Sequence, residues 1–407
     1  MAVKSPRRLI SEWRVMRVAA VPAPDSPGPL AGIRVIDTSN TFMAPYATLL
    51  MAQMGAEVIK VEEPGGDILR QVADTTGTGA GPVFLNTNQG KKSVVLDIRG
   101  DHDYAILTRL VADADVFVHN RPPAAARRLR VDYPSLGPGN PRLIHCGAFG
   151  YGSGGPYRDL PAYDDVIQAA SGFAYVQTNG GEPQYVRSSV ADKTSGLFVL
   201  AAILAALFER ERSGLGQAVE VPMFEAMASF VLLEQQGGAV YDPPRGAPLY
   251  ARTASVNRHP YRTADGMIAV MLYTDKHWQT FFRLIDRPAL ASDARFATMS
   301  ARTAHTDALY GIVESELKAR PTAEWLRLFG EHRIPATTVN SITDLLGDPH
   351  IAAVGLIKES RHPEVGRIRT PGLPVKFSRS KPPVVGPAPL LGQHNHLLDE
   401  LGGGASG

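Results

Sequence analysis

Asp192 is the residue whose type and position point most directly to chemistry. It stands near the start of the segment 188–221, which reads SSVADKTSGLFVLAAILAALFERERSGLGQAVEV. A carboxylate can act as a nucleophile and form a covalent acyl intermediate, and the small residues Ala191, Ser195 and Gly196 leave room for a substrate to approach. The alternative is an N-cap, an aspartate that accepts hydrogen bonds from the first N–H groups of a helix. The segment alone leaves both interpretations open.

The apolar run after Asp192 predicts a helix that would position this carboxylate. The run is too short, and too soon followed by charges at 209–212, to span a bilayer. We therefore expect a helix in the core of the protein, buried on most sides. Gly214 ends it, and the alternating segment 217–221 predicts a strand.

The N-terminal half has the pattern of an open α/β sheet. Strand-like segments at 32–37 and 57–62 flank a helix that Pro45 is suited to begin. Such a unit predicts parallel strands with a right-handed crossover, and ligands of such sheets gather at the carboxyl ends of the strands. The first strand is not followed by G-x-G-x-x-G, and the chain has no G-x-x-x-x-G-K-[ST]. These absences argue against a standard dinucleotide fold and a P-loop nucleotidase.

Two groups of basic residues are candidates for binding an anion. Lys91 and Lys92 stand beside a predicted strand, where they either meet phosphates or form a solvated turn. A cluster of arginines follows the predicted strand 115–120 and consists of Arg121, Arg127, Arg128 and Arg130. Guanidinium groups match phosphate geometry, so this cluster is the stronger candidate, with a solvent-exposed helix face as its alternative. The glycine-rich segment 151–158 would let the backbone approach a ligand closely.

Composition limits the function classes. The formal net charge of +2 does not provide the concentrated basic face of a nucleic-acid-binding protein, and we expect neither a nucleic-acid partner nor a membrane partner. A single cysteine, Cys146, excludes an intramolecular disulfide and a multi-cysteine metal site. It lies in an apolar strand-like run and is interpreted as a core residue. Cysteine usage points to a reducing compartment, so we expect a cytoplasmic protein.

The 407 residues exceed one average domain and predict two. The first residues are rich in Arg, Pro and Ala, and we prefer an N-terminal extension to an organellar transit peptide because prolines would interrupt an amphipathic helix there. The expected division is a disordered segment or extension (1–29), the N-terminal part of a large domain (30–234), a linker (235–258), a small domain (259–333), a linker with a C-terminal return to the large domain (334–402) and a flexible tail (403–407).

Seven segments, in order along residues 30–402, resemble the family III coenzyme A transferases, a group that includes formyl-CoA transferase, carnitine CoA-transferase and the related α-methylacyl-CoA racemases. The matching segments are 30–37 (LAGIRVID), 55–62 (GAEVIKVE), 88–97 (NQGKKSVVLD), 114–120 (ADVFVHN), 154–159 (GGPYRD), 163–172 (YD and QAASG) and 389–394 (PLLGQH). None of these segments is decisive alone, but seven in register are not expected by chance.

The resemblance implies an acyl-CoA:carboxylate CoA-transferase with Asp192 as the nucleophile. Its partners would be an acyl-CoA and a carboxylic acid, with coenzyme A as a substrate rather than a permanently bound cofactor, and no metal. The family fold implies a large Rossmann-like parallel-sheet α/β domain built from both chain ends, a small α+β domain, and an interlocked homodimer.

The resemblance also assigns binding residues position by position. CoA contacts would fall on Phe42, Met43, Leu96, Asp97, Arg99, Asn120, Arg121 and Arg128. Tyr163 and Asp164 match positions near the reacting thioester. Backbone N–H groups of the glycine-rich loop or of the helix start would stabilise the oxyanion.

Departures from the family pattern narrow the function. The racemase branch has a histidine where this chain has Tyr163, and tyrosine, with an unperturbed pKa near 10, exchanges an α-proton poorly at neutral pH. A glycine run typical of formyl-CoA transferases is absent from 251–260, and Phe42 replaces a polar glutamine. We therefore expect a larger or less polar acyl group than formyl or oxalyl. Arg258 and His259 either meet an acceptor carboxylate or form an ordinary surface turn. An acyl-CoA racemase or epimerase and a non-catalytic acyl-CoA-binding protein remain the alternatives.

Overall fold

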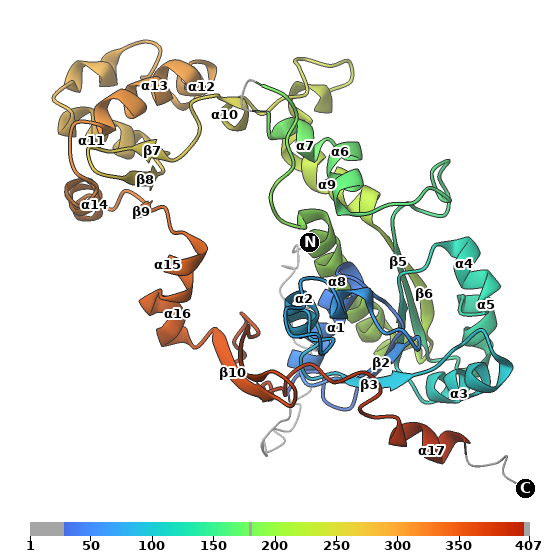
Figure 1. Ribbon diagram of the computed structural model, residues 1–407. Coiled ribbons are helices and arrows are strands. Elements are labelled where there is room, and N and C mark those ends of the chain that lie inside the picture. Colours follow the sequence, from blue (N-terminus) through green and yellow to red (C-terminus); the bar gives the residue numbers. More distant parts are fainter. Residues whose placement is uncertain (1–27, 179–180, 403–407) are drawn as a thin grey trace, which may run out of the picture.

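A six-stranded parallel sheet forms the centre of the larger part of the molecule (Figure 1). In this computed structural model, residues 28–178 and 181–402 are described. The strand order is β3-β2-β1-β4-β5-β6, and the strands are β1 (Arg34–Asp37), β2 (Glu57–Glu62), β3 (Lys92–Val95), β4 (Val116–His119), β5 (Ile144–Phe149) and β6 (Gln217–Pro222). All their pairings are parallel, which confirms the predicted α/β sheet.

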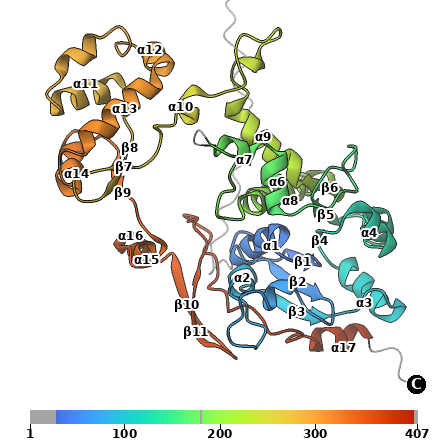
Figure 2. The same ribbon diagram turned by 45° about the horizontal axis from the view of Figure 1, so that its top comes forward.

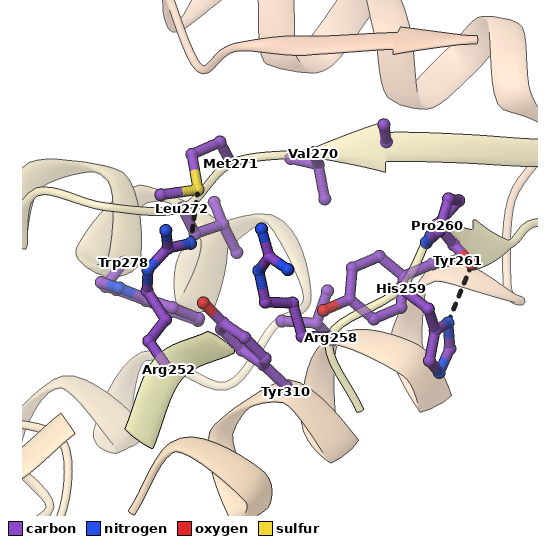
Figure 3. Close-up of a pocket in the computed structure, with 12 residues that line it drawn as sticks. Arg252, Arg258, His259, Pro260, Tyr261, Val270, Met271, Leu272, Trp278 and Tyr310 are labelled. Atoms are coloured by element: carbon purple, nitrogen blue, oxygen red, sulfur yellow. Dashed lines mark hydrogen bonds between the residues drawn. The ribbon is translucent and has the colours of Figure 1, made fainter. Parts of the chain in front are cut away.

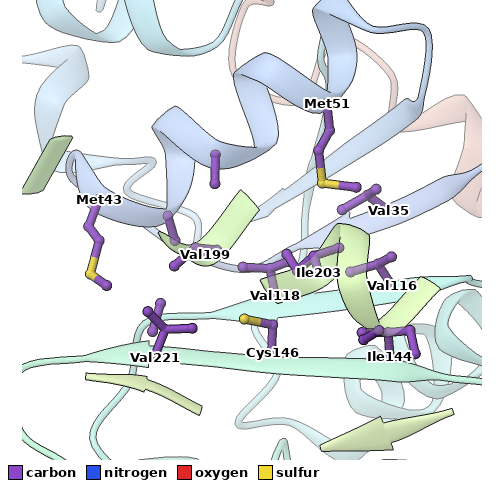
Figure 4. Close-up of a cluster of buried hydrophobic side chains, with 14 of the residues drawn as sticks. Val35, Met43, Met51, Val116, Val118, Ile144, Cys146, Val199, Ile203 and Val221 are labelled. Atoms are coloured by element: carbon purple, nitrogen blue, oxygen red, sulfur yellow. The ribbon is translucent and has the colours of Figure 1, made fainter. Parts of the chain in front are cut away.

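Helices cover both faces of this sheet, which explains its nearly continuous apolar strands. One face packs against α1 (Met43–Gln53) and α8 (Val190–Ser213). Figure 4 shows this core, in which Cys146 is fully buried among valine, isoleucine and methionine side chains. Burial raises the pKa of the Cys146 thiol to about 12, so its interpretation as a core residue is confirmed. The other face packs against α3 (Asp101–Ala112) and the C-terminal α17 (His396–Gly402).

Helix α8 differs from two expectations. Its 24 residues, with a mean hydropathy of 1.7 over the most apolar window, are long and apolar enough to cross a membrane by length and composition, so the expectation that the run is too short was wrong. Nor is it buried on most sides. Its buried residues recur along one face that packs on α1 and the sheet, whereas Leu197, Phe198 and Phe208 on the rest of the helix are 48%, 44% and 68% exposed.

The C-terminal segment packs against the large sheet. The backbone N–H of Ser93 donates to His394 Nδ1 at 3.1 Å, and that of Val95 donates to Asn395 Oδ1 at 2.9 Å. Leu397, together with its apolar neighbours on α17, packs into the α3 side of the core. The expected extension at 1–29 falls almost wholly, and the tail at 403–407 wholly, outside the described residues.

A second, smaller core surrounds a three-stranded antiparallel sheet in the order β7-β8-β9. Its strands are β7 (Tyr261–Arg262), β8 (Met267–Val270) and β9 (Ala336–Thr338), and its helices are α10 (Ala251–Ala254), α11 (Asp275–Leu284), η4 (Pro288–Ser292), α12 (Met299–Ala304), α13 (Thr306–Leu317) and α14 (Thr322–Glu331). Aromatic side chains dominate its interior, among them Trp278, Phe281 and Trp325. Because β9 follows residue 333, this sheet extends into the segment expected to be a linker.

The remaining elements lie around the large sheet or on the path back from the small core (Figure 2). Around the large sheet lie η1 (Ile68–Arg70), α2 (Pro82–Thr87), α4 (Pro123–Arg128), α5 (Tyr133–Leu136), η2 (Gly137–Gly139), α6 (Asp164–Ala170), α7 (Phe173–Val176), α9 (Met223–Gln235) and η3 (Gly237–Val240). The return path from the small core consists of α15 (Ile342–Leu346), α16 (Pro349–Val354) and the hairpin β10 (Ile357–His362) and β11 (Gly366–Pro371).

Candidate active site

A cavity of about 260 Å³ lies at the carboxyl ends of the central strands. The segments after β1, β4 and β5 contribute to its wall, among them Asn40, Asn120 and Gly150. The sheet order reverses between β1 and β4, and this is the point at which open α/β sheets bind their ligands. Asp192 lines the same cavity from the first turn of α8.

The position of Asp192 in α8 shows that it is not an N-cap. The helix begins at Val190 and Ser189 precedes it, so Asp192 is already helical. Its backbone N–H donates to Asp164 Oδ1 at 2.9 Å, which fixes the first turn of α8 to the start of α6. The N-cap interpretation is therefore wrong, and the carboxyl group of Asp192 faces the cavity.

The electrostatic environment makes the Asp192 carboxyl group unusually basic. Burial raises its pKa from 3.8 to about 7, and the nearby Asp164 carboxylate contributes to the increase. A backbone hydrogen bond from Met43 and the charge of Lys193 oppose this increase. A carboxylate whose pKa is raised to about 7 is still partly ionised at neutral pH, and it is a better nucleophile than an exposed carboxylate. Groups in a cavity whose pKa is strongly shifted are candidates for a functional role.

Asp164 is held in place by a chain of hydrogen bonds. Gln168 Nε2 donates to Asp164 Oδ2 at 2.6 Å, and Gln168 Oε1 accepts from the backbone N–H of Val186 at 2.9 Å. Both Asp164 and Gln168 are buried. The hydrogen-bonded Asp164 and Gln168 connect α6 to the segment before α8. Asp164 therefore positions Asp192 by accepting a hydrogen bond from the Asp192 backbone N–H, and the Asp164 charge raises the pKa of the Asp192 carboxyl group.

Asp164 provides a test of this electrostatic arrangement. The rate constant kcat/KM of the wild-type enzyme should rise with pH through about 7, as Asp192 loses its proton. In Asp164→Asn the like charge is gone and the remaining oxygen can still accept from the Asp192 N–H, although the hydrogen bond from Gln168 is lost. The rise should therefore move to lower pH. The matched control is Asp165→Asn, which removes an exposed charge from the neighbouring position and should leave the profile in place. An unchanged midpoint in Asp164→Asn would show that the Asp164 charge does not act on Asp192.

Gly196 allows α1 and α8 to approach each other where they meet at the site. A Cβ atom at this position would lie 2.6 Å from the carbonyl oxygen of Met43 and 3.1 Å from the Tyr46 ring. Because a backbone atom is the closest neighbour, the contact can be relieved only by moving one helix. Such a movement would shift the Met43 N–H away from Asp192.

We therefore expect Gly196→Ala to reduce both stability and activity. Overpacking of this kind costs roughly 1–3 kcal/mol of unfolding free energy, measured by urea denaturation. Gly330→Ala in α14 is the control, because a Cβ atom added there would have nothing within 4 Å, and alanine is the better helix former. If the two variants have equal stability, the close approach of α1 and α8 at Gly196 does not constrain the site.

The cavity brings together several of the residues expected at the site. Met43, Asn120, Tyr163 and Asp192 all line it, and Asp164 lies behind Asp192. Phe42 immediately precedes α1, and its ring centre is 5.9 Å from Lys193 Nζ. Arg121 follows β4, where its Nη1 donates to the carbonyl oxygen of Thr38 at 2.8 Å. Neither Arg121 nor Phe42 is part of the lining.

Other expected CoA contacts lie outside the lining of this cavity. Leu96 is 2% exposed in the core between the sheet and α3. Asp97 and Arg99 form an exposed ion pair of 2.6 Å just beyond β3. Arg128 is exposed on α4. Their assignment to CoA stays a prediction.

The sequence interpretation missed part of the wall. Asn40, Thr41 and Arg158 line the cavity, and the first two were detectable as polar residues directly after a buried strand. The backbone N–H of Gly152 donates to Glu225 Oε1 at 2.9 Å, and that of Ser153 to Glu220 Oε1 at 2.6 Å. These carboxylates accept hydrogen bonds from N–H groups of the glycine-rich loop that were expected to bind a ligand.

The two lysines at the start of β3 also differ from both expectations. Lys91 is fully buried, with its Nζ 3.1 Å from Asp37 Oδ2. Lys92 pairs with Glu57 at 2.5 Å on the partly exposed side of the same strand. Neither residue lines the cavity, so Lys91 is a structural cation rather than a phosphate ligand or part of a solvated turn.

Within the described ranges no cluster of three or more His, Cys, Asp or Glu residues is arranged to hold a metal ion. The chemistry of the cavity is that of one basic carboxyl group, surrounded by amide, hydroxyl and apolar groups and by the guanidinium group of Arg158. Such an arrangement suits acyl exchange on a carboxylate.

Comparison with known proteins supports the same class of chemistry. The profile of CoA-transferase family III matches residues 30–395. The chain is similar to a mouse (Mus musculus) succinyl-CoA:glutarate CoA-transferase, at 31% identity over 93% of this chain and 87% of that protein. It is also similar to a succinate–glutarate CoA-transferase of Agrobacterium fabrum, at 32% identity over 93% and 97%.

A solved structure shows the same fold. The orthorhombic crystal structure of Rv3272 from Mycobacterium tuberculosis superposes with a TM-score of 0.79 at 30% identity, covering 92% of this chain and 99% of that chain. The match of the family profile over most of the sequence, together with these relatives, establishes the relationship. The chain belongs to CoA-transferase family III.

Proposed function

We propose that this CoA transferase works through a covalent intermediate on Asp192. The observation that carries the proposal is the buried carboxyl group of Asp192, with a pKa raised to about 7, in a cavity at the switch point of the sheet. Membership of the family makes the overall reaction a transfer of CoA between an acyl-CoA and a carboxylic acid. Asp192 supplies the group on which the acyl and CoA parts are exchanged.

The proposed cycle balances without a further reactant. An Asp192 oxygen attacks the thioester carbonyl carbon, the C–S bond breaks, and a mixed anhydride and a CoA thiolate result. The thiolate attacks the Asp192 carbonyl carbon, which releases the donor acid and leaves an aspartyl-CoA thioester. The acceptor carboxylate attacks that thioester and displaces the thiolate. The thiolate then attacks the acceptor's acyl carbon, which forms the new acyl-CoA and restores the Asp192 carboxylate.

The racemase alternative is less well supported by the site. It requires a second acid–base group beside the aspartate, and the residues that line the cavity include no histidine. Tyr163, at the position where the racemases carry histidine, is 73% exposed. A mere acyl-CoA-binding protein would gain nothing from a buried carboxyl group that is costly to ionise.

We propose a short dicarboxylic acid as one of the two substrates. The relatives named above act, by their names, on succinate and glutarate, and another similar protein from Haloarcula hispanica is a succinyl-CoA:mesaconate CoA-transferase. Relatives named for oxalate are similar to this chain as well. The replacement of a polar residue by Phe42 favours an acyl group larger than formyl.

We also propose that the chain works as an interlocked homodimer in the cytoplasm, with neither nucleic acid nor membrane as a partner. The support for the dimer is the uncovered apolar surface of α8 and α9, on which Phe208 and Leu233 are 68% and 88% exposed. Burial of such residues stabilises an association. Light scattering on the purified protein should give twice the 43.8 kDa chain mass; a monomer would contradict the proposal.

The overall activity is tested by incubating the protein with succinyl-CoA and a panel of acids. We expect chromatography to show a new acyl-CoA in amounts equal to the succinyl-CoA consumed, with little free CoA. Glutarate, mesaconate and oxalate discriminate among acceptors, and an amide of each acid is the control without a nucleophilic carboxylate. Absence of any new acyl-CoA over the whole panel would contradict the proposed dicarboxylate substrate.

A further inference from the structure

A second cavity of about 280 Å³ lies in the small core and carries two arginines on its wall. Arg252 comes from α10, and Arg258 from the segment before β7. Figure 3 shows both guanidinium groups turned toward the same side of the cavity, with the hydroxyl group of Tyr310 beside them. Asp192 does not line this cavity, so within one chain it is separate from the active site.

The charges of these two arginines are not balanced by acidic side chains. Within the described part of the chain, neither Arg252 nor Arg258 forms an ion pair. Arg252 Nε instead donates to the hydroxyl oxygen of Tyr250 at 3.3 Å. Glu314 on α13 is shared between His259 at 3.7 Å and Lys318 at 3.3 Å. Two like charges on one wall repel each other, and an anion between them would relieve this repulsion.

The rest of the wall indicates the kind of anion. Trp278 is 4% exposed, and its ring stacks on that of Tyr310 at 6.5 Å between centres and 21° between planes. Aliphatic side chains from β8 and α13 complete this part of the cavity. A guanidinium group binds a carboxylate through two parallel hydrogen bonds, while the apolar wall suits a short hydrocarbon chain. These two features together match a small aliphatic acid better than a fully polar anion such as phosphate.

We propose that this cavity binds a short aliphatic carboxylate, of the same chemical class as the acids that the transfer uses, with Arg252 and Arg258 holding its carboxylate group. The choice of this class rests on the proposed function. The site is one of binding alone, distinct from the position at which the reacting acid meets Asp192.

The test measures binding in the absence of turnover. The full chain carrying Asp192→Asn is titrated with glutarate by calorimetry, and the titration is repeated with Arg252→Gln or Arg258→Gln added. Each arginine change should weaken glutarate binding by about tenfold or more, because a charge-assisted hydrogen bond is lost. Arg262→Gln is the matched control, since Arg262 is exposed on β7 and does not line the cavity. It should leave the affinity unchanged.

Two further ligands show what the site recognises. Glutaramide, the neutral analogue of glutarate, should bind at least about tenfold more weakly than the acid. Inorganic phosphate that competes as well as glutarate would overturn the carboxylate assignment in favour of general anion binding. Equal glutarate affinity in all arginine variants would overturn the site altogether. Transfer activity of the wild-type protein is measured separately, so loss of the site and loss of the proposed function are distinguishable.

Discussion

We expect Asp192→Asn to transfer CoA at least ~10³-fold more slowly than the wild-type protein, because the change removes the only group proposed to carry the acyl and CoA parts. The amide is almost the same size as the carboxylate, so the cavity is preserved. Acyl-CoA should still bind, since Asn120 and the other wall residues are unchanged. The expected pattern is therefore a loss in kcat with little change in the dissociation constant for acyl-CoA. Steady-state kinetics and equilibrium binding measure the two quantities.

The same variant should be more stable than the wild type above neutral pH. The Asp192 pKa is about 7 in the folded chain and 3.8 in the reference state, so ionisation is more costly when the protein is folded. This cost is absent below pH about 4, grows as the pH rises, and is complete above pH about 7, where it is at most about 4 kcal/mol. Urea unfolding at pH 5 and pH 8 should show a gain for Asp192→Asn that is larger at pH 8. A loss of stability at pH 8 would indicate a structural role for the carboxylate instead.

The second large effect is expected at Lys91, whose ammonium group lies in a buried network under the active-site loop. Its Nζ donates to Asp37 Oδ2 at 3.1 Å, to the carbonyl oxygen of Pro45 at 3.0 Å and to Thr48 Oγ1 at 2.8 Å. The charges of Lys91 and Lys60 help to hold the pKa of Asp37 at about 2. The other Asp37 oxygen accepts from the backbone N–H of Ser39 at 2.9 Å, which fixes the start of the loop that leads to the cavity.

Lys91→Met should lower the unfolding free energy by about 3–5 kcal/mol, because it leaves the Asp37 carboxylate buried with one cation fewer. Lys92→Met provides an adjacent control. The Lys92 and Glu57 side chains are 38% and 32% exposed, and an ion pair of that kind contributes at most about 1 kcal/mol. Urea denaturation of the two variants compares them directly. Similar losses at the two positions would show that burial of the Lys91 network is not what stabilises this region.

The effect of Lys91→Met should also depend on pH. Loss of the cation lets the folded variant take up a proton on Asp37 at a higher pH than the wild type does. A neutral Asp37 needs no buried cation, so the difference from the wild type should shrink as the pH falls. A difference that is constant with pH would point to lost packing rather than to charge.

Much of the fold could be predicted because local patterns and tertiary structure agree. The apolar strands Glu57–Glu62 and Val116–His119 were recognisable from side-chain type and periodicity. Small residues and an apolar helix made Asp192 a candidate, but only the family resemblance gave it the role of nucleophile. The switch point of the sheet, by contrast, depends on strand order, which no local pattern specifies.

The errors come from interactions between residues distant in sequence. Lys91 and Lys92 are adjacent in sequence, yet the Lys91 side chain is buried and the Lys92 side chain is partly exposed. The partner of Lys91 is Asp37, which lies on another strand and could not be identified from the local sequence. The exposure of Phe208 was missed because an all-apolar helix predicts burial without saying on which sides. The glycine-rich loop was expected to offer free N–H groups, but Glu220 and Glu225 accept from two of them.

The most direct test of the covalent cycle is intact-protein mass spectrometry after incubation with succinyl-CoA, followed by hydroxylamine treatment and peptide mapping. We predict a covalent CoA or acyl adduct that maps to Asp192, reacts with hydroxylamine, and is absent from Asp192→Asn. Asp165→Asn should form the adduct as the wild type does. Rapid CoA transfer with no adduct at Asp192, or with an adduct at another residue, would contradict the assignment of the nucleophile.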